Sequence, residues 1–213
     1  MIGQRFLNPS LIPILCGLVL NRLFYGPIFG QYRVPKYKEL ISKLEERLET
    51  SSNRPCGWND LCNVDVKMLD DISWIQSYIS PCLRRFSDDI GVKINYQLDA
   101  GGWISCYNKG GFQEAHQHFQ DVSAVFIMNS GVNFAQFYFL DRHSSDYPDA
   151  WLRKVLPQQE SGSSMTAQDT YRPKLSTGDL ILFPSHIYHG VSVHKSDIMR
   201  KTFAFNMYIH SVE

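Results

Sequence analysis

The sequence predicts a single α+β domain, in which two helices come first and pack on one sheet of a following β-sandwich or barrel. Apolar residues recur at helical spacing in the first part of the chain, and from Val92 onward they occur in short strand-like runs separated by turn residues. Helices followed by strands are typical of α+β domains. A chain of 213 residues with 44% hydrophobic residues can form one sizeable core but is short for two.

The N-terminal part is interpreted as residues 1–22, an extension or packed strand, followed by one domain over residues 23–213. The apolar run Leu11–Leu20 is too short for a transmembrane helix, and no small-residue cleavage site follows it. Pro35–Thr50 is expected to be an amphipathic helix, because its leucines fall on one face. A second helical stretch runs roughly over Val66–Phe86, and Pro81 is expected to kink or split it.

The second half of the chain contains six candidate strands separated by turns and one long loop. The loop, Asp141–Gly178, is rich in polar residues, and segments of this length are either binding-site lids or disordered. Both interpretations of the loop stay open. The candidate strands are Val92–Leu98, Trp103–Asn108, Val122–Met128, Phe134–Leu140, Leu180–Phe183 and Lys201–Ile209.

Charge and cysteine content narrow the class of protein. Lys+Arg and Asp+Glu number 21 each, so the chain lacks the net positive charge typical of nucleic-acid binders, and no segment indicates a membrane partner. The five cysteines are odd in number and have no CxxC spacing. They are interpreted as reduced, which favours a cytoplasmic location, with a Cys56–Cys62 disulfide as the weaker alternative.

Three histidines have the arrangement of metal ligands. His116 and His118 are two residues apart, so both side chains leave the same face of an extended segment and can approach one ion. His189 follows the apolar strand that ends at Pro184, as a further ligand from a second segment would. Imidazole groups bind iron, zinc, copper and nickel. His186 competes with His189 for this role, but it has the opposite parity in an extended segment.

The last predicted strand carries a candidate anion-binding residue. Arg200 follows His189 with ten residues between them, so the two are expected on the arms of a hairpin-like pair of strands. Two sets of residues alternate along the strand: Arg200, Thr202, Ala204, Asn206 and Tyr208 on one face, and Phe203, Phe205, Met207 and Ile209 on the other. We expect the apolar set to pack on the helices and the polar set to line a cavity. A guanidinium in a cavity needs an anion, and a bidentate carboxylate fits it. The competing interpretation is a buried salt bridge with an acidic residue.

Several motifs together resemble those of a known family. In order, they are Tyr107-x-x-Gly110 with His116 six residues after the glycine, His116-x-His118, Gly178-Asp179 entering Leu180–Pro184, His189, and Arg200-x-Thr202. Over roughly Phe24–Ile209, this set resembles the non-haem Fe(II)- and 2-oxoglutarate-dependent dioxygenases, in particular the 2OG-Fe(II) oxygenase branch found in bacteria and phages. The resemblance implies an α+β fold with a double-stranded β-helix (jelly-roll) core and N-terminal helices packed on one sheet.

The resemblance also implies roles for the residues named above. His116 and His189 would bind Fe(II), Arg200 would bind the distal carboxylate of 2-oxoglutarate, and Thr202 and Tyr107 would donate further hydrogen bonds. The chain departs from the family at one position, because His118 stands where the metal-binding carboxylate is expected. His118 as the third ligand is the preferred interpretation. The alternatives are Asp121, or water or a substrate halide at that position.

The function implied by the resemblance is oxidative decarboxylation of 2-oxoglutarate with O2, coupled to hydroxylation of a substrate. That substrate is left open among protein side chains, small metabolites and nucleobases, the last of which the neutral net charge only weakly disfavours. A three-histidine cupin-like metal enzyme that uses no 2-oxoglutarate would explain His118 but leave Arg200 without a role. A non-enzymatic jelly-roll binding module is the third hypothesis.

Overall fold

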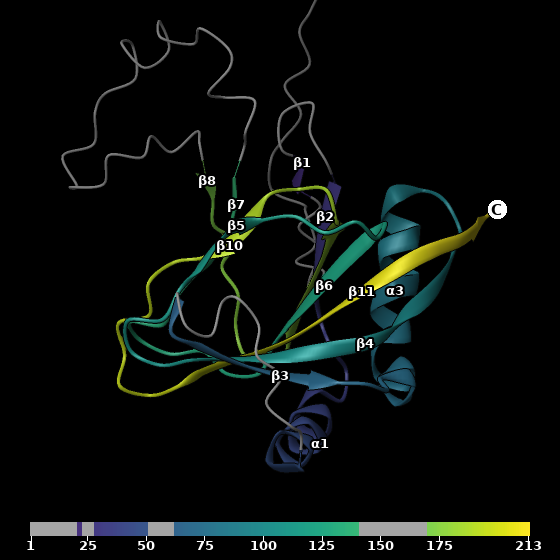
Figure 1. Ribbon diagram of the computed structural model, residues 1–213. Helices are drawn as coiled ribbons and strands as arrows, with labels where there is room; N and C mark the ends of the chain where they lie inside the picture. Colours follow the sequence, from purple (N-terminus) through teal and green to yellow (C-terminus); the bar gives the residue numbers. More distant parts are fainter. Residues whose placement is uncertain (1–20, 23–27, 51–61, 141–169) are drawn as a thin grey trace, which may run out of the picture.

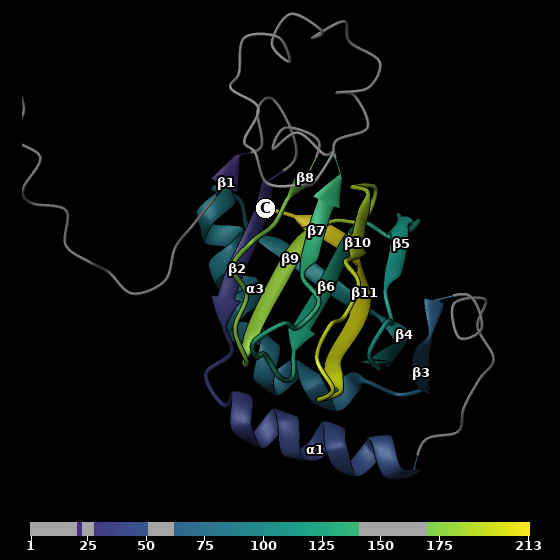
Figure 2. The same cartoon turned by 90° about the vertical axis from the view of Figure 1, so that its left-hand side faces the viewer.

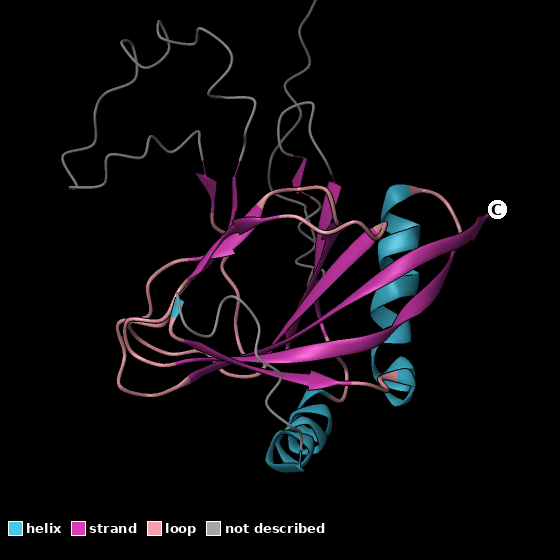
Figure 3. Cartoon of the chain, in the orientation of Figure 1, coloured by secondary structure: helices cyan, strands magenta, loops and turns pink. Residues whose placement is uncertain are grey.

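The chain forms two facing antiparallel sheets around an internal pocket, with helices outside the larger sheet (Figures 1 and 3). The computed structural model describes residues 21–22, 28–50, 62–140 and 170–213. In chain order the elements are β1 (Asn21–Arg22), β2 (Ile28–Arg33), α1 (Tyr37–Thr50), β3 (Val64–Leu69), the 3-10 helix η1 (Ser73–Ile75), α3 (Gln76–Ile90), β4 (Ile94–Tyr107), β5 (Gln113–His116), β6 (Val122–Ile127), β7 (Phe137–Leu140), β8 (Thr170–Tyr171), β9 (Asp179–Pro184), β10 (His189–Val191) and β11 (Arg200–Val212).

The strand order confirms the predicted jelly-roll core. The larger sheet has the order β1-β2-β9-β6-β11-β4-β3, and the smaller has the order β5-β10-β7-β8. Strands that are distant in sequence lie side by side, since β11 pairs with both β4 and β6. His189 and Arg200 therefore begin strands in different sheets, so the expected hairpin-like pairing of their segments is wrong. The two sheets instead bring both residues to one internal pocket.

The main core lies between the larger sheet and the helices. Phe203, Phe205 and Met207 of β11 belong to this core, together with Leu40 and Leu44 of α1 and the apolar face of α3. Figure 2 shows α1 running across one end of the strands and α3 behind them. The predicted packing of helices on one sheet is confirmed. Near the end of β11 both faces of the strand are exposed to solvent, as the exposed side chains of Tyr208 and Ile209 show. The sequence-based expectation that both faces are buried along the whole strand is therefore wrong at these two residues.

Phe205 and Ile209 lie on the same face of β11 but differ in burial, so replacing each with alanine should reduce the free energy of unfolding by very different amounts. Phe205→Ala should lower the free energy of unfolding by about 3–5 kcal/mol, because Phe205 is 0% exposed and its ring stacks on Phe203 with centroids 5.5 Å apart. Ile209→Ala should cost no more than about 1 kcal/mol, because Ile209 is 39% exposed. Denaturant unfolding of both variants measures the difference, and equal losses would contradict this view of the core.

The second predicted helix is only partly correct. Its first residues form β3, in which Val64 and Val66 are buried and the strand pairs with β4. Valine is β-branched and favours strands, and the adjacent edge of β4 offers backbone partners, so pairing overrides the helical spacing. The helix proper, α3, runs unbroken through Pro81, so the expected split does not occur.

The turn predicted between the strands Val92–Leu98 and Trp103–Asn108 is also wrong, because β4 continues through it as one strand of 14 residues. The glycines in its middle permit close backbone approach instead of a turn. A Cβ atom at Gly101 would lie 2.9 Å from the carbonyl oxygen of Leu69, and one at Gly102 would lie 2.9 Å from that of Ala204. Both carbonyls belong to strands that pair with β4.

Several sequence-based predictions lie wholly or partly outside the described residues. These concern residues 1–20, Cys16, Cys56, His143 and most of the loop Asp141–Gly178. The end of that loop is described and forms β8, which pairs with β7. Cys62, Cys82 and Cys106 are buried and free, as expected for reduced cysteines. Of the helices that the structure describes, none combines the length and apolar character needed to cross a bilayer.

Candidate metal centre and anion pocket

One pocket between the two sheets collects the predicted site residues. The larger sheet contributes the inward-facing residues of β4, β6 and β11, and the smaller sheet contributes residues of β5, β7 and β10. The register explains why β4 and β11 act together, because Tyr107, Ser105 and Trp103 pair with Arg200, Thr202 and Ala204. The lining residues are Trp103, Ser105, Tyr107, Gln113, His116, His118, Ser123, Ala124, Val125, Phe137, His189, Val191, Arg200, Thr202, Ala204 and Asn206.

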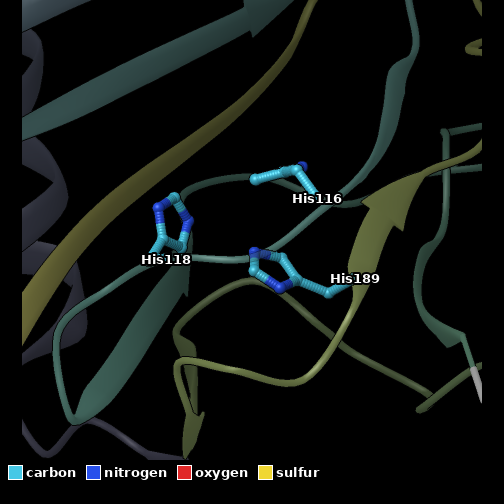
Figure 4. Close-up of side chains that lie close together, drawn as sticks. All are labelled: His116, His118 and His189. Atoms are coloured by element: carbon cyan, nitrogen blue, oxygen red, sulfur yellow. The ribbon is translucent and has the colours of Figure 1, made fainter.

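The three predicted histidines converge in this pocket (Figure 4). Each of His116, His118 and His189 offers one ring nitrogen, and these nitrogens lie within 4.8 Å of one another. His116 ends β5 and His189 begins β10, and the two residues are direct partners in the pairing of these strands. Imidazole nitrogens at this separation can share one transition-metal ion after small rotations of the rings.

Backbone contacts fix which nitrogen two of these rings present. The Nδ1 atoms of His116 and His189 lie 2.8 Å from the carbonyl oxygens of Glu114 and Ile187. A carbonyl oxygen can only accept, so each Nδ1 carries the proton and, in a neutral ring, Nε2 is left as a bare ligand atom. The protein therefore orients both rings before a metal arrives.

Burial keeps the three imidazoles neutral at ordinary pH. Desolvation lowers the pKa of His189 to about 3 and that of His118 to about 4, and it also lowers the pKa of His116. The mutual repulsion of the rings in their charged forms acts in the same direction for His118 and His189. A neutral imidazole is the form that binds a metal ion, so this donor set fits a divalent transition metal.

The carboxylate alternative does not join the cluster. Asp121 is exposed, and its Oδ2 accepts a hydrogen bond from the backbone N–H of Ile209 at 2.8 Å. Within the described part of the chain, the group that could hold a metal consists of the three histidines alone. His118, at the position of the expected carboxylate, is the third side chain that the fold brings to the others.

The remaining described histidines lie away from this cluster. His186 and His210 are exposed. His194 is buried and satisfied, because its Nδ1 accepts from the N–H of Ala135 at 3.0 Å and its Nε2 lies 2.8 Å from the carbonyl oxygen of Ile198. The cluster therefore includes His189, which parity and spacing favoured, and not its competitor His186.

Arg200 is buried in the same pocket without a counter-charge from the described chain. It is 3% exposed, and its Nη1 atom is buried with no hydrogen-bond partner. No ion pair links Arg200 to a described acidic residue, which argues against the structural salt bridge. Burial lowers the pKa of this guanidinium, because an uncompensated buried charge is costly. The orphaned donor fits a carboxylate ligand.

Tyr107 lies against this guanidinium, and Thr202 lines the same pocket. The Arg200 Cζ atom lies 4.8 Å from the centroid of the Tyr107 ring, so the ring supports the cation. The Tyr107 hydroxyl donates to Gln113 Oε1 at 2.9 Å, so its proton is already engaged within the protein. Thr202 is buried and lines the pocket on the same face of β11.

Sequence reasoning missed Gln113, Ser123 and Ser185 as part of this site. Gln113 holds Tyr107, and Ser123 lies on β6 with its hydroxyl 2.8 Å from that of Ser185. One signal was present for Ser123, since it is the polar residue in the otherwise apolar run VSAVFI. Nothing in the local sequence indicates that Ser185 meets Ser123, because the contact spans 62 residues.

A jelly roll that holds a three-histidine cluster and a buried arginine in one pocket fits a metal-dependent oxygenase, and the comparisons lead to the same class. The family model described as "Putative 2OG-Fe(II) oxygenase" matches residues 101–206, which include every residue of the cluster and Arg200. The chain belongs to the 2OG-Fe(II) oxygenase superfamily, whose members use Fe(II) and 2-oxoglutarate.

Solved structures of this superfamily share the fold at low sequence identity. A 2OG-Fe(II) oxygenase family oxidoreductase from Burkholderia pseudomallei is 13% identical, with a TM-score of 0.54 over 85% of this chain and 84% of the other. HygX from Streptomyces hygroscopicus, solved with nickel and 2-oxoglutarate bound, is 12% identical, with a TM-score of 0.54 over 85% and 83%. A Pseudomonas putida prolyl-4-hydroxylase is 15% identical, with a TM-score of 0.54 over 85% and 92%. No curated protein sequence matches the chain.

Proposed function

We propose that this protein is a hydroxylase that couples the oxidative decarboxylation of 2-oxoglutarate to the hydroxylation of a second substrate. In balanced form, 2-oxoglutarate, O2 and a substrate C–H bond give succinate, CO2 and the corresponding alcohol. The observation that carries the proposal is the unpartnered Nη1 atom of Arg200 in the pocket that also holds His116, His118 and His189. Metal ligands alone would fit many metal enzymes, but this buried anion site also requires a carboxylate.

The residues divide into two sets of roles. The Nε2 atoms of His116 and His189, with an imidazole nitrogen of His118, would hold Fe(II), which supplies O2 activation when bound. Arg200 would bind the distal carboxylate of 2-oxoglutarate, with Thr202 beside it and the Tyr107 ring against the guanidinium. The buried walls of the pocket exclude water from the reacting groups.

A direct test is anaerobic titration of the Fe(II)-loaded protein with 2-oxoglutarate. We expect a visible metal-to-ligand charge-transfer band at one equivalent of iron, because a 2-oxo acid that chelates Fe(II) produces such a band. Glutarate has both carboxylates but no 2-oxo group, so it should produce no band. Saturation with 2-oxoglutarate without any band would contradict chelation at the iron.

The three-histidine set favours one second candidate, a metal enzyme that oxidises its own substrate without 2-oxoglutarate. The two functions differ in one product, since only the proposed reaction releases succinate when 2-oxoglutarate is added in air. A protein that binds no iron under reconstitution would instead be a metal-free binding module. We propose protein side chains and small metabolites as the candidate classes for the second substrate. The three buried free thiols support a reducing, cytoplasmic location for the protein.

A further inference from the structure

Three buried polar side chains form a connected chain of hydrogen bonds in the pocket wall. The Ser185 and Ser123 hydroxyl oxygens are 2.8 Å apart, and the Ser123 hydroxyl donates to Asn206 Oδ1 at 2.8 Å. Ser123 and Asn206 face each other on the paired strands β6 and β11, and Ser185 follows the end of β9. Buried polar groups of this kind are costly unless they are hydrogen-bonded, and here they satisfy one another.

The donors of this chain can be assigned in order. An amide oxygen only accepts, so the single hydroxyl proton of Ser123 is committed to Asn206. Ser185 must then donate its proton to Ser123. The result is a fixed Asn206 amide whose Oδ1 faces the serines. Its Nδ2 makes no hydrogen bond to a described residue and, unlike the Nη1 atom of Arg200, is not fully buried, so it stays accessible from the pocket that Asn206 lines.

Hydrogen bonds connect this amide to the segment that carries His118. The Ser185 carbonyl oxygen accepts from the backbone N–H of His118 at 2.9 Å, so one serine supports both the histidine and the hydrogen-bond chain to Asn206. Arg200 lies on the same strand six residues earlier, and six residues of strand span about 20 Å between Cα atoms. Both residues line the pocket, so they enter it from well-separated points of one strand.

We propose that Asn206 Nδ2 donates a hydrogen bond to the metal-binding 2-oxo acid end of 2-oxoglutarate, and that Ser123 and Ser185 position its amide. This inference rests on the proposed function and specifies how the second end of the cosubstrate is held. A neutral donor suits that carboxylate, because the metal ion already compensates its charge. The distal carboxylate, which touches no metal, takes the full cation of Arg200.

Truncated ligands separate the two ends of the cosubstrate. Protein loaded with Ni(II), which holds the ligand without turnover, is titrated calorimetrically with 2-oxoglutarate, with pyruvate and with butyrate. Pyruvate keeps only the 2-oxo acid end, and butyrate keeps the distal carboxylate and its methylene chain but has no 2-oxo acid group. Asn206→Ala should weaken 2-oxoglutarate and pyruvate alike by about 10-fold or more, the usual cost of losing a hydrogen bond to a charged group. The affinity of this variant for butyrate should stay within about 2-fold of the wild type, because butyrate lacks the group that Asn206 is proposed to bind.

Two further variants make the test specific. Asn206→Asp keeps the shape and replaces a donor with a negative charge, so it should weaken pyruvate more than Asn206→Ala does. Ser123→Ala frees the amide to rotate and should weaken pyruvate binding by a few-fold with no effect on butyrate binding, a split that general loss of structure would not produce. Asn95→Asp is the matched control, because the Asn95 Nδ2 also meets a serine hydroxyl, Ser211 Oγ at 2.8 Å, but in solvent.

The outcomes of this experiment are distinct. Folding of each variant is checked by circular dichroism, and if Asn206→Asp does not fold, Asn206→Ala and Ser123→Ala decide the result. Wild-type affinity for pyruvate in Asn206→Ala overturns the inference while leaving the proposed function intact. Equal losses for pyruvate and butyrate also overturn it, because they indicate a general disturbance of the pocket. Failure of the wild-type protein to bind 2-oxoglutarate at all would count against the proposed function itself.

Discussion

His189→Ala is expected to abolish 2-oxoglutarate-dependent succinate formation and to lower iron affinity by more than about 100-fold. Loss of a group that merely orients a metal ligand costs about 10–100-fold in affinity or activity, so loss of a ligand should cost more. His189 is buried at the centre of the cluster, with its ring centroid 4.4 Å from that of His116 and 5.2 Å from that of His118. Alanine would leave two imidazoles, too few to hold Fe(II) firmly in a facial site.

The measurement is iron bound per chain after anaerobic reconstitution, together with succinate released in air. His186→Ala is the control, because His186 is only three residues away in the sequence but is exposed. It should keep wild-type iron content and turnover. Undiminished succinate formation by His189→Ala, or an equal loss in both variants, would remove His189 from the metal site.

The site was easier to predict from the sequence than the elements that carry it. Parity grouped His116 with His118, and Arg200 with Thr202 and Asn206, and all five residues line the pocket. Side chains alternate along any extended segment regardless of its partner, and this holds for His118 although β5 ends at His116. Strand partners depend on contacts between distant parts of the chain. The sequence around Val66 therefore did not reveal that its hydrogen bonds go to β4, and the run from Val66 was misread as helix.

Two kinds of residue were beyond local reasoning. Ser185 and Gln113 matter only because the fold brings them to Ser123 and Tyr107. The glycines of β4 look like a turn until the neighbouring carbonyls that they accommodate are known. The histidine in place of the carboxylate was visible from the start, and the structure adds that no described acidic residue replaces it in the cluster.

Arg200→Met is expected to raise the concentration of 2-oxoglutarate needed for half-maximal turnover by about 30-fold or more, and to leave the iron requirement within about 3-fold of the wild type. Truncating one partner of a buried, hydrogen-bonded charge pair costs about 2–5 kcal/mol, and each 1.4 kcal/mol is tenfold in affinity. Methionine fills much of the same volume as arginine, so the weaker use of 2-oxoglutarate would result from the lost charge and its hydrogen bonds. Arg33→Met is the matched control, because Arg33 is half-exposed and already paired with Asp179 at 3.2 Å.

Arg200→Met should weaken the use of 2-oxoglutarate but stabilise the protein when no ligand is bound. Arg200 buries a guanidinium nitrogen without a partner, a burial that destabilises the fold unless an anion is present. Arg200→Met should therefore unfold at a higher temperature than the wild type when no 2-oxoglutarate is added. Adding 2-oxoglutarate should raise the melting temperature of the wild type and leave that of the variant almost unchanged. If Arg200→Met is instead destabilised without ligand and still stabilised by 2-oxoglutarate, then Arg200 supports the fold rather than binding the cosubstrate.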